Sequence, residues 1–350
     1  DLYGKREEKY RWLEEHDLTS AGYRPIQPDS TWYFFIPRDT SDILQYLEWP
    51  RVSDIFPVFV TGIVTARDHF VISFEISELR RRIMQFRDLS LSDEIIREAY
   101  KLKDTRGWKL PLARKELASD PLWDTYYREI LYRPFDVRYI YYTPKMVDWG
   151  RPEVMRHMLA GENLALITHK REELNIPWAH ALITNLITEH GVTSSKTTNY
   201  HFPLYLYPST TAPEMFLQTR TPNLAEWLLP KLSNAYGFTP TPEQVLAYIY
   251  AVLYSPTYRQ KYAAELRIDF PRVPFTADPD LFLQMAALGQ ELIDLHLLRK
   301  VPAQAGVKYQ GQGSDQIEFV RYDPQSGRVA INRDKYFESI TPEMWNYHIG

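Results

Sequence analysis

Apolar residues recur with helical spacing in several segments of this chain. The spacing predicts helices over residues 5–18, 42–49, 77–87, 92–103, 152–159 and 279–298. The segment Thr241-Pro242-Glu243-Gln244 combines a capping box with a proline at the first helical position. It therefore predicts that a further helix begins here and continues through residues 245–254.

Other segments are rich in β-branched and aromatic residues, a composition typical of strands. Such runs occupy residues 31–36, 56–65, 69–75, 130–142, 163–168, 179–184 and 200–207. The runs 56–65 and 69–75 flank a short turn, so we expect a hairpin or two adjacent strands there. Residues 317–322 and 328–332 predict a final strand pair, and the glycine-containing segment 310–314 is expected to be a mobile loop.

This mixture of elements predicts an irregular mixed α+β fold with two lobes. Residues 1–221 would form an α+β lobe built on mixed sheets. Residues 222–350 would form a mainly helical lobe that ends in a small β-hairpin.

The composition excludes several classes of protein. The 350 residues are 44% hydrophobic and 25% charged, which is typical of a folded globular protein and not of a disordered chain or a membrane bundle. There is no cysteine, so disulfides, thiol catalysis and thiolate metal sites are excluded. The formal net charge is −4, so any binding to nucleic acid would depend on a local basic surface. Because the chain begins with Asp1, we expect a fragment or a processed product. We also expect the protein to be located in the cytoplasm, without contact to a membrane.

Motifs for catalysis are missing from the sequence. It contains no phosphate-binding loop, no HExxH pair and no G-x-S-x-G elbow. Gly311 and Gly313 form a bare G-x-G without the expected helix after it. We therefore expect no catalytic residues and no metal site in this chain.

Polar residues gather in three segments next to predicted strands: residues 145–151 with 156–157, residues 168–173, and residues 188–199. They offer arginine and lysine donors together with serine, threonine, asparagine and histidine, which are the side chains that contact phosphates and base edges. The alternative is that these segments are ordinary solvated loops, which are polar in any protein. The candidates for DNA binding are Lys145, Arg151, Arg156, His169, Lys170, Arg171, Glu173, Ser195, Lys196 and Asn199.

Two further groups of charged residues have competing interpretations. Arg80, Arg81 and Arg82 could contact phosphates, but consecutive helical residues point about 100° apart, so a solvated helix face is the simpler interpretation. Arg133, Asp136 and Arg138 lie within the aromatic run 130–142. We interpret these three as a structural charge network rather than as direct contacts to DNA, because charges among aromatic side chains need partners when buried.

Long ordered motifs give the chain a family resemblance. The segment 130–142 reads ILYRPFDVRYIYY, residues 151–168 read RPEVMRHMLAGENLALIT, and residues 199–208 read NYHFPLYLYP. Together with residues 4–18, 61–72 and 247–275 and the final WNYHIG, they resemble the C-terminal specificity region of type I single-polypeptide (type ISP) restriction–modification enzymes. The resemblance extends over almost the whole chain.

The resemblance implies a function. In that family one polypeptide carries a nuclease, a translocating ATPase, an adenine methyltransferase and a target-recognition region, and this chain resembles only the last. The implied partners are double-stranded DNA and the methyltransferase domain of the same polypeptide, joined through the N-terminal part of this chain. S-adenosylmethionine, ATP and Mg²⁺ would serve the full-length enzyme only. The alternative is a protein-interaction scaffold that docks the catalytic domains without reading bases.

Overall fold

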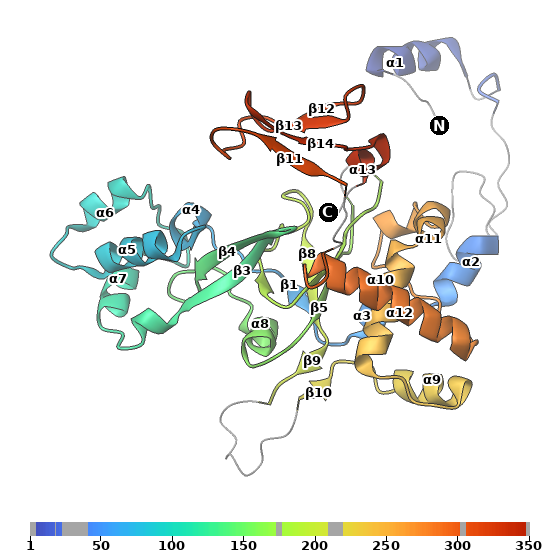
Figure 1. Cartoon of the computed structure of the whole chain (residues 1–350), viewed down its shortest axis with the longest axis horizontal. Helices are drawn as coiled ribbons and strands as arrows, with labels where there is room; N and C mark the ends of the chain where they lie inside the picture. The colour runs from blue at the N-terminus through green and yellow to red at the C-terminus, as the bar shows by residue number, and fades with distance from the viewer. Residues whose placement is uncertain are drawn as a thin grey trace. The chain divides into compact units, whose positions relative to one another are not determined.

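The computed structural model describes residues 5–17, 19–22, 41–172, 177–208, 220–301 and 306–347 (Figure 1). The chain divides into two compact units, Asp1–Pro50 and Arg51–Gly350. In the first unit, helices α1 (Arg6–Glu15) and α2 (Ser41–Glu48) occupy the two predicted helical segments. The strand predicted at residues 31–36 lies outside the described residues.

The second unit contains helices and several open sheets, which confirms the α+β fold class. Most of the predicted helices are present with bounds shifted by a few residues. The helices are α3 (Val52–Ile55), α4 (Asp68–Val71), α5 (Ile76–Arg87), α6 (Asp93–Ala99), α7 (Leu110–Ala118), α8 (Pro152–Leu159), α9 (Leu228–Tyr236), α10 (Pro242–Tyr254), α11 (Pro256–Lys261), α12 (Pro279–His296) and α13 (Pro342–Asn346), with short 3-10 helices at Trp123–Thr125 and Glu265–Arg267.

The first of the two central sheets has the order β2-β4-β3-β7. The predicted strand run 130–142 forms its hairpin, which turns at Pro134-Phe135, with Phe135 at a positive φ of 63°. Helix α5 contacts β2 and β4, and its apolar face joins the main hydrophobic core of this part of the chain. The strands are β2 (Ile72–Ser73), β3 (Tyr127–Arg133), β4 (Asp136–Tyr141) and β7 (Ile187–Thr188).

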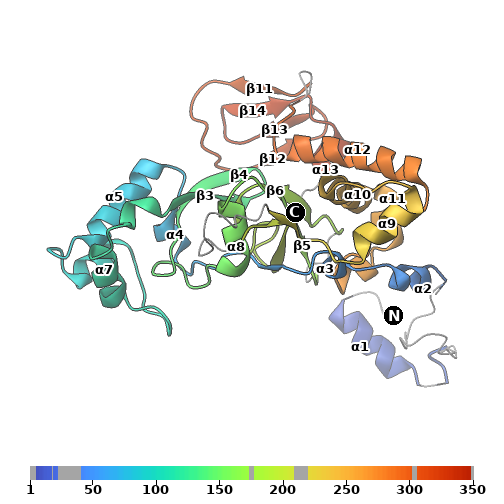
Figure 2. The same ribbon diagram turned by 90° about the horizontal axis from the view of Figure 1, so that it is seen from below.

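The second central sheet has the order β1-β8-β5-β6, and its neighbouring strands are antiparallel. Its strands are β1 (Val60–Thr61), β5 (Ala165–His169), β6 (Ala181–Thr184) and β8 (Asn199–Pro203). The two views of the molecule show α5 and α7 on one side of the strands and α10 and α12 on the other (Figures 1 and 2). A separate short pair joins β9 (Tyr205–Leu206) to β10 (Thr221–Pro222).

The expectation of a hairpin or two adjacent strands over residues 56–75 is wrong. Only the two-residue strands β1 and β2 form there, and they belong to different sheets. Between them, Phe70 and Val71 lie in the single-turn helix α4 and are fully buried in the core. A run of bulky apolar residues is compatible with a strand or with a buried helical turn, and here packing selects the turn.

Helices α10 and α12 pack against each other along most of their length. Residues 245–254 of α10 are all buried, and the capping box at Thr241 and Gln244 begins the helix as predicted. Gly289 permits the close approach of α12, because a Cβ atom there would lie 1.8 Å from the carbonyl oxygen of Ala247. Tyr254 at the end of α10 donates a hydrogen bond of 2.6 Å to the carbonyl of Ala181 in β6.

The last sheet has the order β11-β14-β13-β12. Its strands are β11 (Lys308–Gly311), β12 (Arg321–Asp323), β13 (Arg328–Ala330) and β14 (Lys335–Glu338). The predicted hairpin is present as β12–β13, but two further strands extend it to a four-stranded sheet. Gln310 and Gly311, placed by the sequence in a mobile loop, pair with Tyr336 and Lys335 of β14. Among the described residues, no helix is long and apolar enough to cross a membrane.

Candidate nucleic-acid interface

Strand register brings the three polar segments to the same end of one sheet. His169 at the end of β5 is the register partner of Asn199 at the start of β8, so the segments that continue from them lie together. On the other side of β8, the backbone N–H of Gly62 donates to the carbonyl of Asn199 at 3.2 Å. We call this end of the sheet, where Thr61, Thr168, Ala181 and Asn199 lie, the loop end.

The first polar segment reaches the loop end through the continuation of β1. Val64 and Trp149 exchange two backbone hydrogen bonds, of 3.0 and 2.9 Å. The segment is also fixed to the α4–α7 part of the core. Buried Arg67 donates to the carbonyl of Met146 and forms an ion pair of 2.6 Å with Asp148. Residues 146–149 are therefore held rigidly. A segment that enters a groove of duplex DNA needs such rigidity.

Rigid anchoring leaves Trp149 and Arg151 at the surface. The indole of Trp149 is 60% exposed, and the Arg151 guanidinium lies 4.9 Å from its ring centre. Arg151 caps α8 in the left-handed backbone region, with φ of 56°. Among the described residues it forms no ion pair, so its charge is available for a phosphate or a guanine edge.

A cavity of about 690 Å³ opens beside this segment. Its lining includes Asp148 and Trp149 together with Arg106 and Trp108 of the connection before α7. Its size and its mixed aromatic and charged lining suit a flat or charged ligand group.

Lys145 and Arg156 have protein partners in this structure. The Lys145 ammonium forms an ion pair of 2.7 Å with Asp120, which raises the pKa of Lys145. Arg156 is exposed and donates to the carbonyl of Tyr207 at 3.1 Å. Lys145 is part-exposed, whereas Arg156 is exposed on the surface of α8.

The segment between β7 and β8 ends at Asn199, whose side chain forms hydrogen bonds back to residues of this segment. Its side-chain amide donates to the carbonyls of His190 and Thr197, and its oxygen accepts from Thr193. Asn199 is 1% exposed, so it holds the loop together and does not itself reach the surface. Ser195 and Lys196 are exposed at the tip, where they are available to a ligand.

The connection after β5 also separates buried candidates from exposed ones. His169 is fully buried, whereas Lys170 and Arg171 are exposed. The Lys170 ammonium lies 6.0 Å from the ring centre of Phe270. Glu173, the remaining candidate of this segment, lies outside the described residues.

The three helix arginines differ in their surroundings. Arg82 is part-buried, bonds the carbonyls of His69 and Ile72 and pairs with Glu78 at 2.6 Å, so it stabilises the α4–β2 turn. Arg80 forms an exposed pair with Asp124 at 3.1 Å. Arg81 is exposed, and no ion pair involves it within the part of the chain that the structure describes.

The charges of the β3–β4 hairpin form two pairs. Arg138 makes a bidentate ion pair with Asp136, with N–O distances of 2.9 and 2.6 Å, and lies over the rings of Phe74 and Tyr132. Arg133 instead pairs with Glu189 at 2.7 Å. The structural role for these three residues remains a prediction.

Residues 54–350 match the family described as the Type ISP C-terminal specificity domain. The chain belongs to this family. The resemblance read from the sequence motifs is therefore confirmed. A comparison with curated proteins gave no match.

Several solved structures share the fold of this Type ISP specificity domain. The DrdV–DNA complex, determined by cryo-electron microscopy, aligns with a TM-score of 0.72 over 98% of the chain at 24% identity. The ATP-dependent Type ISP restriction–modification enzyme LlaBIII bound to DNA gives 0.67 over 90% at 18% identity. A nuclease-deletion mutant of the Type ISP enzyme LlaGI in complex with a DNA substrate mimic gives 0.62 over 87% at 20% identity. This chain spans 36%, 21% and 24% of those three chains, respectively.

Glu189 and His190 lie at the loop end of the specificity domain and were not among the site residues predicted from the sequence. Glu189 is buried and contacts Arg133, His190 and the backbone N–H of Gly191. Its carboxylate raises the pKa of His190 above the ordinary value. Burial alone would raise the pKa of Glu189, but these contacts hold it below its usual range. Both residues lie in the polar segment 188–199 that the sequence singles out, but the sequence gives no signal for the pairing of Glu189 with Arg133, which is 56 positions away.

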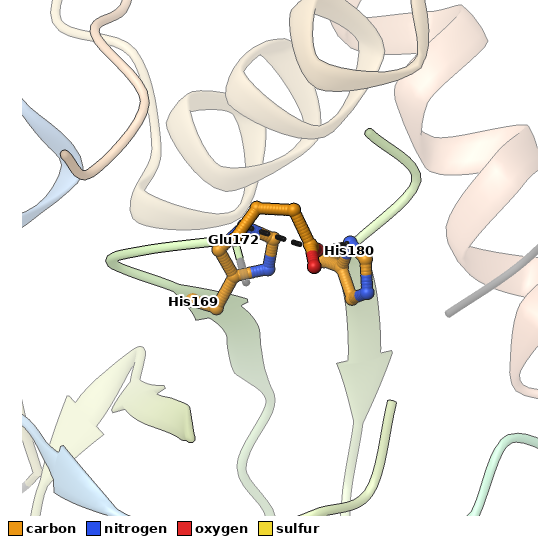
Figure 3. Close-up of side chains that lie close together, drawn as sticks. All are labelled: His169, Glu172 and His180. Atoms are coloured by element: carbon orange, nitrogen blue, oxygen red, sulfur yellow. Dashed lines mark ion pairs between the residues drawn. The ribbon is translucent and has the colours of Figure 1, made fainter. Parts of the chain in front are cut away.

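A second unforeseen cluster joins His169, Glu172 and His180 (Figure 3). All three side chains are buried, and the two histidines lie at facing ends of β5 and β6. The sequence shows no close histidine pair, since these two are separated by ten residues and meet only through strand register.

Proposed function

We propose that this chain recognises a specific sequence in double-stranded DNA through the loop end. The observation that carries the proposal is the convergence of three anchored segments at one end of one sheet, where Arg171 and Lys196 are exposed and Arg151 is part-exposed. Anchoring matters because base readout needs side chains held at fixed positions, whereas general attraction to phosphates needs only charge.

The charge distribution is consistent with this role. The net charge of −4 gives no general attraction to DNA, so a local group of cations must supply it. Arg151 beside exposed Trp149 offers both a forked donor and an aromatic surface. The solved relatives that share the fold include DNA complexes of DrdV, LlaBIII and LlaGI, which supports the same kind of ligand.

Within the whole enzyme, the domain would position the target for chemistry done elsewhere. We propose that an adenine methyltransferase and an ATP-dependent nuclease lie in other parts of the same polypeptide. S-adenosylmethionine, ATP and Mg²⁺ would bind to those parts. Residues 1–221 would form the target-recognition lobe and its join to the methyltransferase, and residues 222–350 would brace it, as the hydrogen bond from Tyr254 to Ala181 suggests.

A scaffold role has one observation in its favour. Helix α12 exposes Leu281, Leu283 and Leu288, and a cavity of about 360 Å³ lies between α10 and α12. Apolar side chains on one helix suit docking of another domain. A scaffold role is compatible with DNA recognition. It becomes the better explanation of the domain only if the chain does not read bases.

Selection of bound sites from a random duplex library tests the proposal. The chain is incubated with the library at low salt, because phosphate contacts weaken steeply as salt rises. We expect enrichment of one sequence motif. Recovery of unenriched DNA by a folded chain, verified by circular dichroism, would mean that base readout lies elsewhere and would favour the scaffold role.

A further inference from the structure

The cluster of His169, Glu172 and His180 has the geometry of a metal site. One nitrogen from each imidazole and one carboxylate oxygen lie within 4.8 Å of one another. The contacts to Glu172 Oε2 come from His180 Nδ1 at 3.1 Å and His169 Nε2 at 3.9 Å. In tetrahedral zinc sites the metal–ligand bonds are about 2.0–2.1 Å, which places neighbouring ligand atoms about 3.4 Å apart. The two measured distances lie on either side of that value.

The polar atoms of the two histidines need an explanation. Both rings are fully buried, and within the described part of the chain none of their four nitrogens forms a hydrogen bond, although His180 Nδ1 makes the ion-pair contact of 3.1 Å with Glu172 Oε2. Buried polar groups in folded proteins are nearly always satisfied, because leaving them unpaired costs free energy. A cation held between the rings would satisfy one nitrogen of each.

The two imidazole rings lie close to each other and to the carboxylate of Glu172. The ring centres are 4.3 Å apart with planes inclined by 72°, and both rings lie against Glu172 (Figure 3).

The local backbone fixes all three side chains before any ion arrives. His169 ends β5 and His180 directly precedes β6, next to the register pair Thr168–Ala181. The backbone N–H of Glu172 donates to the carbonyl of Arg267 at 3.0 Å. The three donors therefore come from a strand end, a strand start and an anchored loop.

One nearby charge opposes a cation. Arg259 lies over the rings of Trp178 and Tyr254 and lowers the pKa of His180 by its positive charge. The Glu172 carboxylate offsets that charge. Two nitrogens and one carboxylate favour zinc and similar transition metals over Mg²⁺ and Ca²⁺, which prefer oxygen ligands alone.

We propose that His169, Glu172 and His180 bind one divalent transition-metal ion of the Zn²⁺ class. Three protein ligands leave a fourth coordination position for water or another small ligand. The ion would tie the β5–β6 connection together at its base. Lys170 and Arg171 stand between two of the ligands in sequence, so the ion would also fix where these exposed cations lie. The metal site does not depend on the proposed DNA recognition, and its test does not use DNA.

The first test measures metal in the whole chain. Protein purified without chelators is analysed by plasma mass spectrometry, then stripped and titrated with Zn²⁺ and with Co²⁺. We expect about one equivalent of Zn²⁺, visible absorption from bound Co²⁺, and a melting temperature that rises with Zn²⁺ concentration. If the stripped chain takes up neither ion and its melting temperature does not respond to them, the proposal is overturned.

Variants locate the ion. Glu172→Gln keeps the size of the side chain and His180→Gln keeps a polar group, and either should reduce bound metal from about one equivalent to nearly none. His201→Gln is the matched control, since His201 is equally buried on the neighbouring strand β8 but bonds Thr188 at 3.1 Å. Circular dichroism verifies folding of each variant. Equal metal content in Glu172→Gln, His180→Gln and the parent would place the ion elsewhere and refute this site.

Discussion

Arg67 and Asp148 are joined by an ion pair of 2.6 Å between Nη2 and Oδ1, although they are 81 positions apart in the sequence. Arg67 is 3% exposed and also lies over the ring of Trp108 at 4.1 Å. The Trp108 indole in turn donates to the carbonyl of Lys145. Through this series of contacts, the segment that carries Trp149 and Arg151 is fixed to the helical part of the core.

Removing the carboxylate of that pair should destabilise the fold. Asp148→Ala leaves a buried guanidinium without its partner charge, and we expect the free energy of unfolding to fall by about 2–3 kcal/mol. Urea denaturation measures it. In the double variant Arg67→Met/Asp148→Ala the loss should be smaller than the sum of the single losses. Additive losses would show that the two residues act independently.

The Asp136–Arg138 pair should also contribute to stability and not to DNA recognition. Both side chains are about a quarter exposed, and their ion pair is bidentate. Asp136→Ala should lower the free energy of unfolding by about 1 kcal/mol, with a clearly lower melting temperature. Sequence preference for DNA should remain that of the parent. A variant that melts like the parent but has lost DNA binding would reverse the assignment.

The packing of α10 on α12 predicts a strong effect at one glycine. A Cβ atom at Gly289 would lie 1.8 Å from the carbonyl oxygen of Ala247, and backbone cannot yield as a flexible side chain can. Gly289→Ala should reduce the free energy of unfolding by about 2–3 kcal/mol despite the better helix propensity of alanine. Gly107→Ala is the control, because no atom lies within 4 Å of a Cβ there. Similar urea midpoints for both variants would contradict the close approach.

Buried histidines predict how stability depends on pH. Burial lowers the pKa of His201 to about 3, whereas histidine in an unfolded chain titrates near about 6.5. Below that pH the unfolded chain takes up a proton that the folded chain does not, so stability falls as pH drops. At pH about 5 this residue alone should cost about 2 kcal/mol. His157, whose pKa burial and then Arg156 lower to about 4, acts in the same direction.

The measurement is the urea midpoint at several pH values. His201→Gln should flatten the dependence below pH about 6.5. His190→Gln should act in the opposite range, because the carboxylate of Glu189 raises the pKa of His190. Its stabilising contribution is present below pH about 6.5 and is lost as pH rises through the folded-state pKa. Other buried histidines, such as His169, keep part of the dependence in each single variant. If neither His201→Gln nor His157→Gln reduces the slope below pH about 6.5, these two histidines are not its source.

Local signals in the sequence predicted several elements well. The capping box at Thr241 is read within one helical turn, and α10 begins where it places the helix. The apolar spacing over residues 152–159 and 279–298 likewise predicted α8 and α12. The α+β class and the family follow from the same local patterns and motifs.

The arrangement of the loop end could not be read in this way. Val64 meets Trp149 and Ile63 meets Glu189 through pairings that depend on tertiary structure. Polarity also did not distinguish exposed from buried candidates: Arg171 and Lys196 are exposed, whereas His169 and Asn199 are buried. Burial of a polar residue depends on which partners the fold brings to it, as the amide of Asn199 shows.

Base reading should be found among Arg151, Arg171 and Lys196. Each is exposed or part-exposed at the loop end, and among the described residues none forms an ion pair that would have to break first. A residue that reads a base should, when changed to alanine, cost about 1–3 kcal/mol on the selected site and relax preference at one base pair. A residue that contacts a phosphate should weaken binding to all sequences alike and reduce the salt slope by about one.

Competitive binding of each variant against single-base-pair changes of the selected site separates these patterns. We expect at least one of the three alanine variants to relax preference at one position, and Arg80 and Arg81 to show at most the phosphate pattern. Arg151→Lys keeps the charge but removes the fork, so it should restore phosphate contact but not bidentate reading of guanine. Lys231→Ala on α9 is the control, an exposed lysine outside the loop end. Unchanged preference at every position in all three loop variants would exclude these residues from base reading, and the scaffold role would then explain the domain better.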